Sequence, residues 1–236
     1  MIMRISNFLT NLGEISLNFQ SDEEVKIITS ELGYNLLSNS FKIEIIEFYD
    51  VKNWLDELKK EEFNQFKVEK TIGWIFKIHK LNDAKKTLSF DCILSPNNSK
   101  VTSEPDTGEH LDSVWIDDEK NVVSIGTEDG EIMKIRAKNN DWMPNRLKDN
   151  LGIVKSGFFL SKRYVEKSIT KILPFGLKTE VPQLFKDENL YFHYLIATNK
   201  LKKNYDHPDE YSIATHLAVD YSKRILIEKL NLKDHF

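Results

Sequence analysis

The 236-residue chain contains a single cysteine, Cys92, and lacks long apolar runs. One thiol cannot form an intramolecular disulfide or a thiolate metal site, so disulfide-stapled and zinc-finger folds are excluded. The longest stretch without charged residues covers only 189–199, whereas a membrane-spanning helix needs about 20 apolar residues. The first ten residues lack the continuous apolar core of an export signal. We therefore expect a cytoplasmic protein that does not cross a membrane.

Cofactor-binding and catalytic motifs are also missing. None of the 9 glycines belongs to the glycine-rich loops that hold nucleotide phosphates. The G-x-S-x-G elbow of serine hydrolases and the H-E-x-x-H motif of metalloproteases do not occur either. Glu131-Ile-Met-Lys134 is close to a magnesium nuclease motif, but its spacing would place the two side chains on opposite faces of a strand. The sequence therefore predicts no cofactor, and we favour a non-enzymatic protein.

Arginine is scarce, with 5 arginines against 28 lysines. Such usage follows from AT-rich codons, so we expect a low-GC bacterium or its phage as the source. Lysine also lacks the planar fork with which arginine reads base edges. The lysine excess therefore does not favour a nucleic-acid partner.

Three segments carry helical patterns. Ser21 and Glu24 form a capping box, and apolar residues at helical spacing follow it, which predicts a helix over 21–33. Asp50 is placed to cap a second helix with an apolar stripe over 50–62. The 3.6-residue apolar period after Pro208 predicts a long C-terminal helix over 209–230.

The middle of the chain carries strand patterns. Period-2 apolar residues predict a hairpin of 72–78 with 88–94, which places Cys92 on a buried face. The Asp129-Gly130 turn signal predicts that 132–137 is the third strand of a meander. Further strands are expected at 114–116, 122–127, 41–49 and 190–197.

These elements predict an α+β fold, with a mostly antiparallel sheet of hairpins and a meander, an N-terminal pair of helices and a long C-terminal helix. We expect one domain over 1–236. A subdivision into 1–95 and 110–236 is the alternative, because the turn-rich stretch between them reads as a linker or a loop.

Charge is segregated within a chain whose overall net charge is −4. Ten acidic residues and one lysine lie between Glu104 and Glu131, whereas eleven basic and three acidic residues lie between Ile132 and Lys178. Carboxylates gathered at loops would raise a negative potential that attracts a basic partner. The candidate partner-binding residues are Asp106, Glu109, Asp112, Asp117, Asp118, Glu119, Glu128 and Asp129.

We therefore predict a bacterial binding protein that contacts the basic surface of a protein partner, with an immunity-type inhibitor of a toxin domain as the specific hypothesis. The alternative is a metal-assisted, nuclease-like hydrolase that uses Asp106, His110, Asp112 or His207. A third hypothesis is nucleic-acid binding by the basic segment, although its aromatic residues fit a core better than a binding surface. The sequence does not define an oligomeric state.

Overall fold

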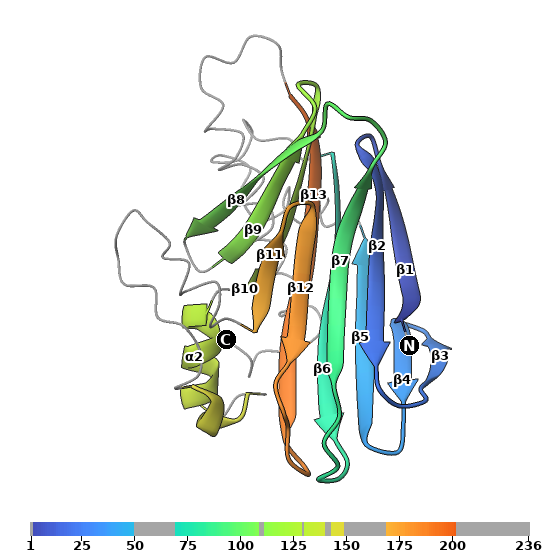
Figure 1. Cartoon of the computed structure of the whole chain (residues 1–236), viewed down its shortest axis with the longest axis vertical. Helices are drawn as coiled ribbons and strands as arrows, with labels where there is room; N and C mark the ends of the chain where they lie inside the picture. Colours follow the sequence, from blue (N-terminus) through green and yellow to red (C-terminus); the bar gives the residue numbers. More distant parts are fainter. Residues whose placement is uncertain are drawn as a thin grey trace.

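The structure is a computed structural model that describes residues 2–49, 69–108, 111–128, 130–139, 143–148 and 169–201. These residues form two antiparallel sheets that pack face to face (Figure 1). The described part also contains one α-helix, α2 (Gly130–Lys138), and a short 3-10 helix, η1 (Asn145–Leu147). No helix in this part of the chain is long and apolar enough to span a membrane.

The smaller sheet has five strands in the order β1-β2-β7-β12-β11. Their bounds are β1 (Ile2–Thr10), β2 (Gly13–Ser21), β7 (Leu88–Pro96), β11 (Thr170–Leu173) and β12 (Gly176–Val181). The sheet is assembled around β7, which pairs antiparallel with β2 on one side and with β12 on the other.

The larger sheet has eight strands in the order β3-β4-β5-β6-β13-β10-β9-β8. Their bounds are β3 (Lys26–Ser30), β4 (Gly33–Leu37), β5 (Phe41–Tyr49), β6 (Lys70–Lys80), β8 (Thr102–Gly108), β9 (Leu111–Asp117), β10 (Asn121–Glu128) and β13 (Asn189–Lys200). Long strands β6 and β13 pair at its centre, from His79 opposite Asn189 to Lys70 opposite Thr198.

The core lies between the two sheets and is rich in aromatic rings. Phe76 of β6 lies 4.7 Å from Phe90 of β7, measured between ring centroids, and 4.4 Å from Phe192 of β13. Cys92 is buried as predicted, and burial raises the pKa of its thiol. In strands such as β7, alternation directs Leu88, Phe90, Cys92 and Leu94 into this layer, because alternate residues of a strand point to opposite faces.

The predicted α+β class is wrong, because the described residues form an almost entirely antiparallel β structure. Residues 21–33, expected as a helix, contain instead the end of β2, the connection to β3, β3 itself and the start of β4. The Ser21 hydroxyl does accept a backbone hydrogen bond, but from Glu23 N at 3.1 Å, which makes a turn rather than a helix cap. The predicted helices over 50–62 and 209–230 lie outside the described residues.

Two predicted strand pairings are also wrong. Strands β6 and β7 lie where they were expected, but they belong to opposite sheets and face each other across the core. Both have an apolar face, and stacking these faces buries more apolar surface than pairing their edges would. The β9–β10 hairpin is confirmed. The expected third strand of the meander, 132–137, lies instead in α2, which begins at Gly130.

Candidate functional site

Three connections meet at one end of the sandwich, at the top of Figure 1. They are the β1–β2 turn, the start of the β7–β8 connection and the β9–β10 turn, and we call this set the loop end. Asn11 Nδ2 donates to Asn121 Oδ1 at 3.2 Å, and Asn97 Nδ2 donates to the carbonyl of Asn11 at 2.9 Å. The backbone N–H of Asn97 also donates to the carbonyl of Leu12 at 2.9 Å. Side chains of asparagine thus join turns from both sheets.

Close backbone packing fixes the loop end further. Gly13 has φ of 145°, and a Cβ there would lie 2.0 Å from the carbonyl oxygen of Ser95. Only glycine permits such an approach at this φ. Asn98 Oδ1 accepts the backbone N–H of Lys100 at 2.9 Å, which shapes the next part of the β7–β8 connection. These asparagines are not among the predicted site residues, although the adjacent Asn97 and Asn98 are a turn signal in the sequence.

The β9–β10 turn places three of the predicted acidic residues at the loop end. Asp118 Oδ1 accepts the backbone N–H groups of Asn121 at 2.9 Å and Lys120 at 3.1 Å, so this carboxylate builds the turn. Asp117 Oδ2 accepts Trp115 Nε1 at 2.9 Å. Glu119 has φ of 73° and is exposed, so its side chain projects from the tip of the turn.

Two other predicted residues are buried instead. Asp112 of β9 is 4% exposed, and Glu128 of β10 is fully buried. Arg136 of α2 donates from Nη1 to Glu128 Oε2 at 2.7 Å and to the carbonyl of Tyr191 at 2.8 Å, with its guanidinium 4.1 Å from the centre of the Tyr191 ring. Glu128 therefore belongs to a buried ion pair with Arg136 of α2. It is not part of an exposed acidic surface.

The remaining predicted residues give no further side-chain geometry. Asp106 lies in β8, opposite Ser113 in register, and its side chain is outside the described part. Glu109 and Asp129 lie outside the described residues altogether. The structure therefore brings together Asp117, Asp118 and Glu119, and it separates them from Asp112 and Glu128.

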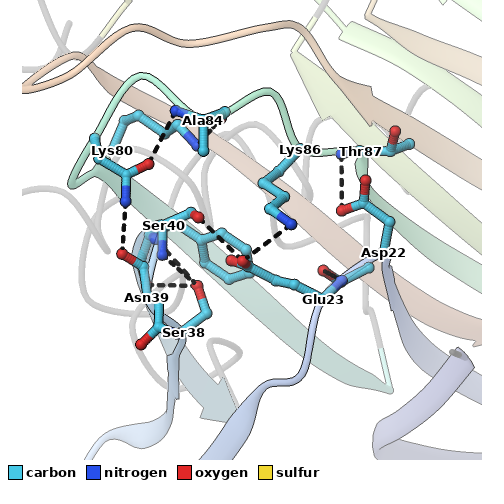
Figure 2. Close-up of polar contacts among 12 residues, drawn as sticks. Asp22, Glu23, Ser38, Asn39, Ser40, Lys80, Ala84, Lys86 and Thr87 are labelled. Atoms are coloured by element: carbon cyan, nitrogen blue, oxygen red, sulfur yellow. Dashed lines mark hydrogen bonds and ion pairs between the residues drawn. The ribbon is translucent and has the colours of Figure 1, made fainter.

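A second polar cluster lies at the end of the sandwich opposite the loop end (Figure 2). Figure 2 shows Glu23 of the β2–β3 connection pointing toward Ser40 of the β4–β5 turn and Lys86 of the β6–β7 connection. The Ser40 hydroxyl donates to Glu23 Oε2 at 3.0 Å, and Lys86 Nζ lies 3.4 Å from the same oxygen. Buried Lys80 donates from Nζ to the carbonyl of Ala84 at 2.7 Å. These contacts tie three connections together.

The ionisation of this cluster follows from its contacts. Burial raises the pKa of Glu23, but hydrogen bonds from Ser38, Ser40 and Lys86, with the charge of Lys86, outweigh it and hold the pKa below the ordinary glutamate value. Burial lowers the pKa of Lys80, against the opposing charge of Glu23. The contacts of Glu23 with Ser40 and Lys86 therefore have a structural role, and we call these three residues the clasp.

A polar pocket of about 330 Å³ lies between η1 and the start of β13. Two of its charged groups are paired with each other, because Arg146 donates from Nε and Nη2 to the two carboxylate oxygens of Glu188 at 2.8 and 2.5 Å. The Arg146 guanidinium also covers the Phe185 ring at 4.1 Å from its centre. This pocket is therefore built by contacts that fix the loop before β13.

The residues proposed for a metal-assisted hydrolase do not form a centre in the described part of the chain. No group of three or more His, Cys, Asp and Glu side chains there is arranged to hold a metal ion. Asp112 is buried, and His110 and His207 lie outside the described residues. Lys134 lies on α2, so the strand geometry considered for the nuclease-like motif does not apply.

Comparison with known proteins adds no functional assignment. No protein-family model and no curated protein matches the chain. The chain has a weak structural similarity to a protein from the human microbiome assigned as a kojibiose phosphorylase, with a TM-score of 0.42 and 6% sequence identity. The match covers 94% of this chain but 22% of that protein, and a likeness at this level carries no argument about function.

The hypothesis of an immunity-type toxin inhibitor is therefore withdrawn. It rested on one continuous acidic surface, whereas Asp112 and Glu128 are buried and Glu128 pairs with Arg136. No family or curated relative points to such a protein. The acidic β9–β10 turn at the loop end remains as the exposed part of the predicted residues.

Proposed function

We propose that the protein is a non-enzymatic binding protein that contacts a basic protein partner through the loop end. The observation that carries this proposal is the convergence of three connections from both sheets, joined by asparagine side chains, with Glu119 projecting from the tip of the acidic turn. Loops positioned by a rigid sandwich are a common place for recognition, because the scaffold holds them at little entropic cost.

The charge of the turn supports a basic rather than an acidic partner. Asp117, Asp118 and Glu119 are consecutive, and within the described residues none of them forms an ion pair. Glu119 is the exposed member of the three, and an exposed carboxylate accelerates association with a positively charged surface. The proposal includes a cytoplasmic location, which is argued from the single cysteine.

Charge reversal at Glu119 tests the proposal. Immobilised wild-type protein and Glu119→Lys are compared by capture from an extract of the source cells, and any captured protein is then purified for calorimetry. We expect the purified partner to bind Glu119→Lys at least about tenfold more weakly, which corresponds to about 1.4 kcal/mol. The affinity of the wild type should also fall as salt rises.

The matched control is Glu31→Lys, which makes the same change in net charge. Glu31 is exposed and lies in the β3–β4 turn, away from the loop end. Its variant should bind the partner like the wild type. Equal weakening by both variants, or a capture profile unchanged by Glu119→Lys, would contradict a role of the loop end.

A further inference from the structure

Glu47 lies at the centre of a hydrogen-bonded cluster that links the two sheets. The pairing of β1 with β2 is irregular between Arg4 and Ser6. Such a bulge changes which face the following side chains take, and Ser6 is then paired with Leu17, a core residue. The Ser6 hydroxyl donates to Glu47 Oε1 at 2.7 Å, from β1 in one sheet to β5 in the other.

Two more donors contact the same carboxylate oxygen. Trp74 Nε1 donates to Glu47 Oε1 at 3.0 Å, and the Tyr49 hydroxyl donates to it at 2.7 Å. Three donors on one oxygen hold the carboxylate in one orientation. The other oxygen, Oε2, has no hydrogen bond with any described residue, and Glu47 forms no ion pair with a described cationic side chain.

Two residues that hydrogen-bond with Glu47 have exposed side chains. The Tyr49 side chain is 53% exposed, and the Leu32 side chain is exposed where its carbonyl accepts the backbone N–H of Glu47 at 2.7 Å. The pKa of Tyr49 lies above the ordinary tyrosine value, first because of burial and then because its hydroxyl donates a hydrogen bond to the Glu47 carboxylate; Tyr34 adds to the effect. Tyr49 therefore remains a neutral donor with an exposed ring.

We propose that Glu47 Oε2 and the Tyr49 ring bind an alkylammonium group. An ammonium is a compact charge that can pair with a single carboxylate oxygen while water accepts its other N–H groups, and the face of a tyrosine ring attracts it further. A guanidinium fits less well, because it binds a carboxylate most strongly through both oxygens at once, and Oε1 already accepts three hydrogen bonds. A calcium ion would need six to eight oxygen ligands. The exposed Leu32 side chain suits the alkyl stem.

Trp74 provides a direct reporter of this site, because its indole N–H donates to Glu47. Protein labelled with ¹⁵N is titrated with butylammonium while the indole signal of Trp74, assigned with Trp74→Phe, is followed by NMR. We expect a saturable shift of this signal. Butylguanidinium should bind more weakly and neutral 1-butanol should cause no saturable shift, whereas equal shifts with 1-butanol, or none with butylammonium, would overturn the proposal.

Variants distinguish the contribution of the Glu47 charge to butylammonium binding from that of the Tyr49 ring. Glu47→Gln should weaken butylammonium binding by about tenfold or more, because a charged hydrogen-bond partner is lost. Tyr49→Leu, which keeps Glu47, should weaken it by about two- to fivefold, as expected for an exposed cation–π contact. The control Glu44→Gln alters a carboxylate of β5 that lies 4.0 Å from Lys77, and binding should be unchanged. Full binding by Glu47→Gln that retains the wild-type fold would overturn the assignment.

A second probe distinguishes a lysine side chain of a protein from a free amine as the ligand of this site. Nα-acetyl-lysine methylamide carries the same group as a lysine side chain in a protein, and butylammonium represents a free amine. Tighter binding of the lysine derivative assigns the site to a protein ligand, and equal binding assigns it to the amine itself. Glu119→Lys should leave both titrations unchanged, so this site and the proposed loop-end function are tested separately.

Discussion

At the scale of single residues, burial decides what a charged side chain contributes. Arg136 is 2% exposed and contacts Glu128, the Tyr191 carbonyl and the Tyr191 ring. His193 is also buried, with Nδ1 3.8 Å from Glu128 Oε2. By contrast, Lys171 and Glu180 form a similar ion pair at 2.9 Å that is about half exposed. Water screens the second pair but not the first.

Removing one partner from each pair should therefore have unequal effects. We expect Arg136→Ala to lower the free energy of unfolding by about 3–5 kcal/mol, because it takes the guanidinium away from a buried carboxylate. Lys171→Ala should lower it by less than about 1 kcal/mol. Urea denaturation followed by circular dichroism measures both, and a small, equal loss in the two variants would contradict the buried ion pair.

The sequence indicated the buried character of Cys92 but not that of Glu128. Cys92 alternates with Phe90 and Leu94, so its face follows from the period of one strand. Glu128 ends a strand that was correctly predicted, and its environment depends on Arg136, which the sequence placed on a strand rather than on α2. A local pattern therefore cannot show that an acidic residue has a buried partner.

At the scale of elements, pairing between strands overrides the helical signal of a single segment. Residues 21–33 contain both a helix cap motif and β-branched residues, and the observed β3–β4 hairpin pairs Ile27 with Leu36. A Cβ at Gly33, where φ is 142°, would lie 2.3 Å from the carbonyl oxygen of Ile45. The helix was predicted from residues 21–33 alone, and β5 lies outside that segment. Pairing of β4 with β5 thus overrides the local helical signal.

The clasp around Glu23 gives an element-scale prediction about pH. Because the pKa of Glu23 is lowered in the folded protein, its carboxylate contributes stability above the unfolded pKa, which is about 4.3 for glutamate. That contribution is lost as pH falls through the lower folded value. Glu23→Gln should therefore be less stable than the wild type at pH 7, and the difference should shrink between about pH 5 and pH 3.

Thermal melts at several pH values measure this difference. The matched control is Glu24→Gln, which makes the same substitution at an exposed neighbouring residue. Its difference from the wild type should stay small and constant over the same range. A Glu23→Gln difference that does not change with pH would show that the clasp acts through shape rather than through charge.

At the scale of the whole molecule, both sheets combine strands from distant parts of the chain. The smaller sheet joins β1, β2 and β7 with β11 and β12, and the larger sheet joins β3–β6 with β8–β10 and β13. Tyr194 of β13 connects the layers, since its hydroxyl lies 2.5 Å from Thr179 Oγ1 of β12 and 3.1 Å from the carbonyl of Phe90 of β7. The prediction of a single domain over 1–236 stays open to experiment.

Unfolding measurements test this interleaved arrangement. Because one core lies between the sheets, we expect tryptophan fluorescence and circular dichroism to report one coincident urea transition. Tyr194→Phe should lower the free energy of unfolding by about 1–2 kcal/mol, since buried hydrogen-bond partners from the other sheet are left without the hydroxyl. Two separate transitions would contradict a shared core.

The sequence by itself determined where most middle strands lie and which of their faces are apolar, because alternation along one strand is a local property. It also excluded disulfides and the common nucleotide-binding loops. Only the tertiary structure decided that β6 and β7 stack across the core, that 132–137 is helical and that Glu128 is buried. Glu47 likewise became a site only when a bulge in β1 brought Ser6 to it from the other sheet. These outcomes depend on contacts between residues far apart in the chain, whose energies no single segment contains.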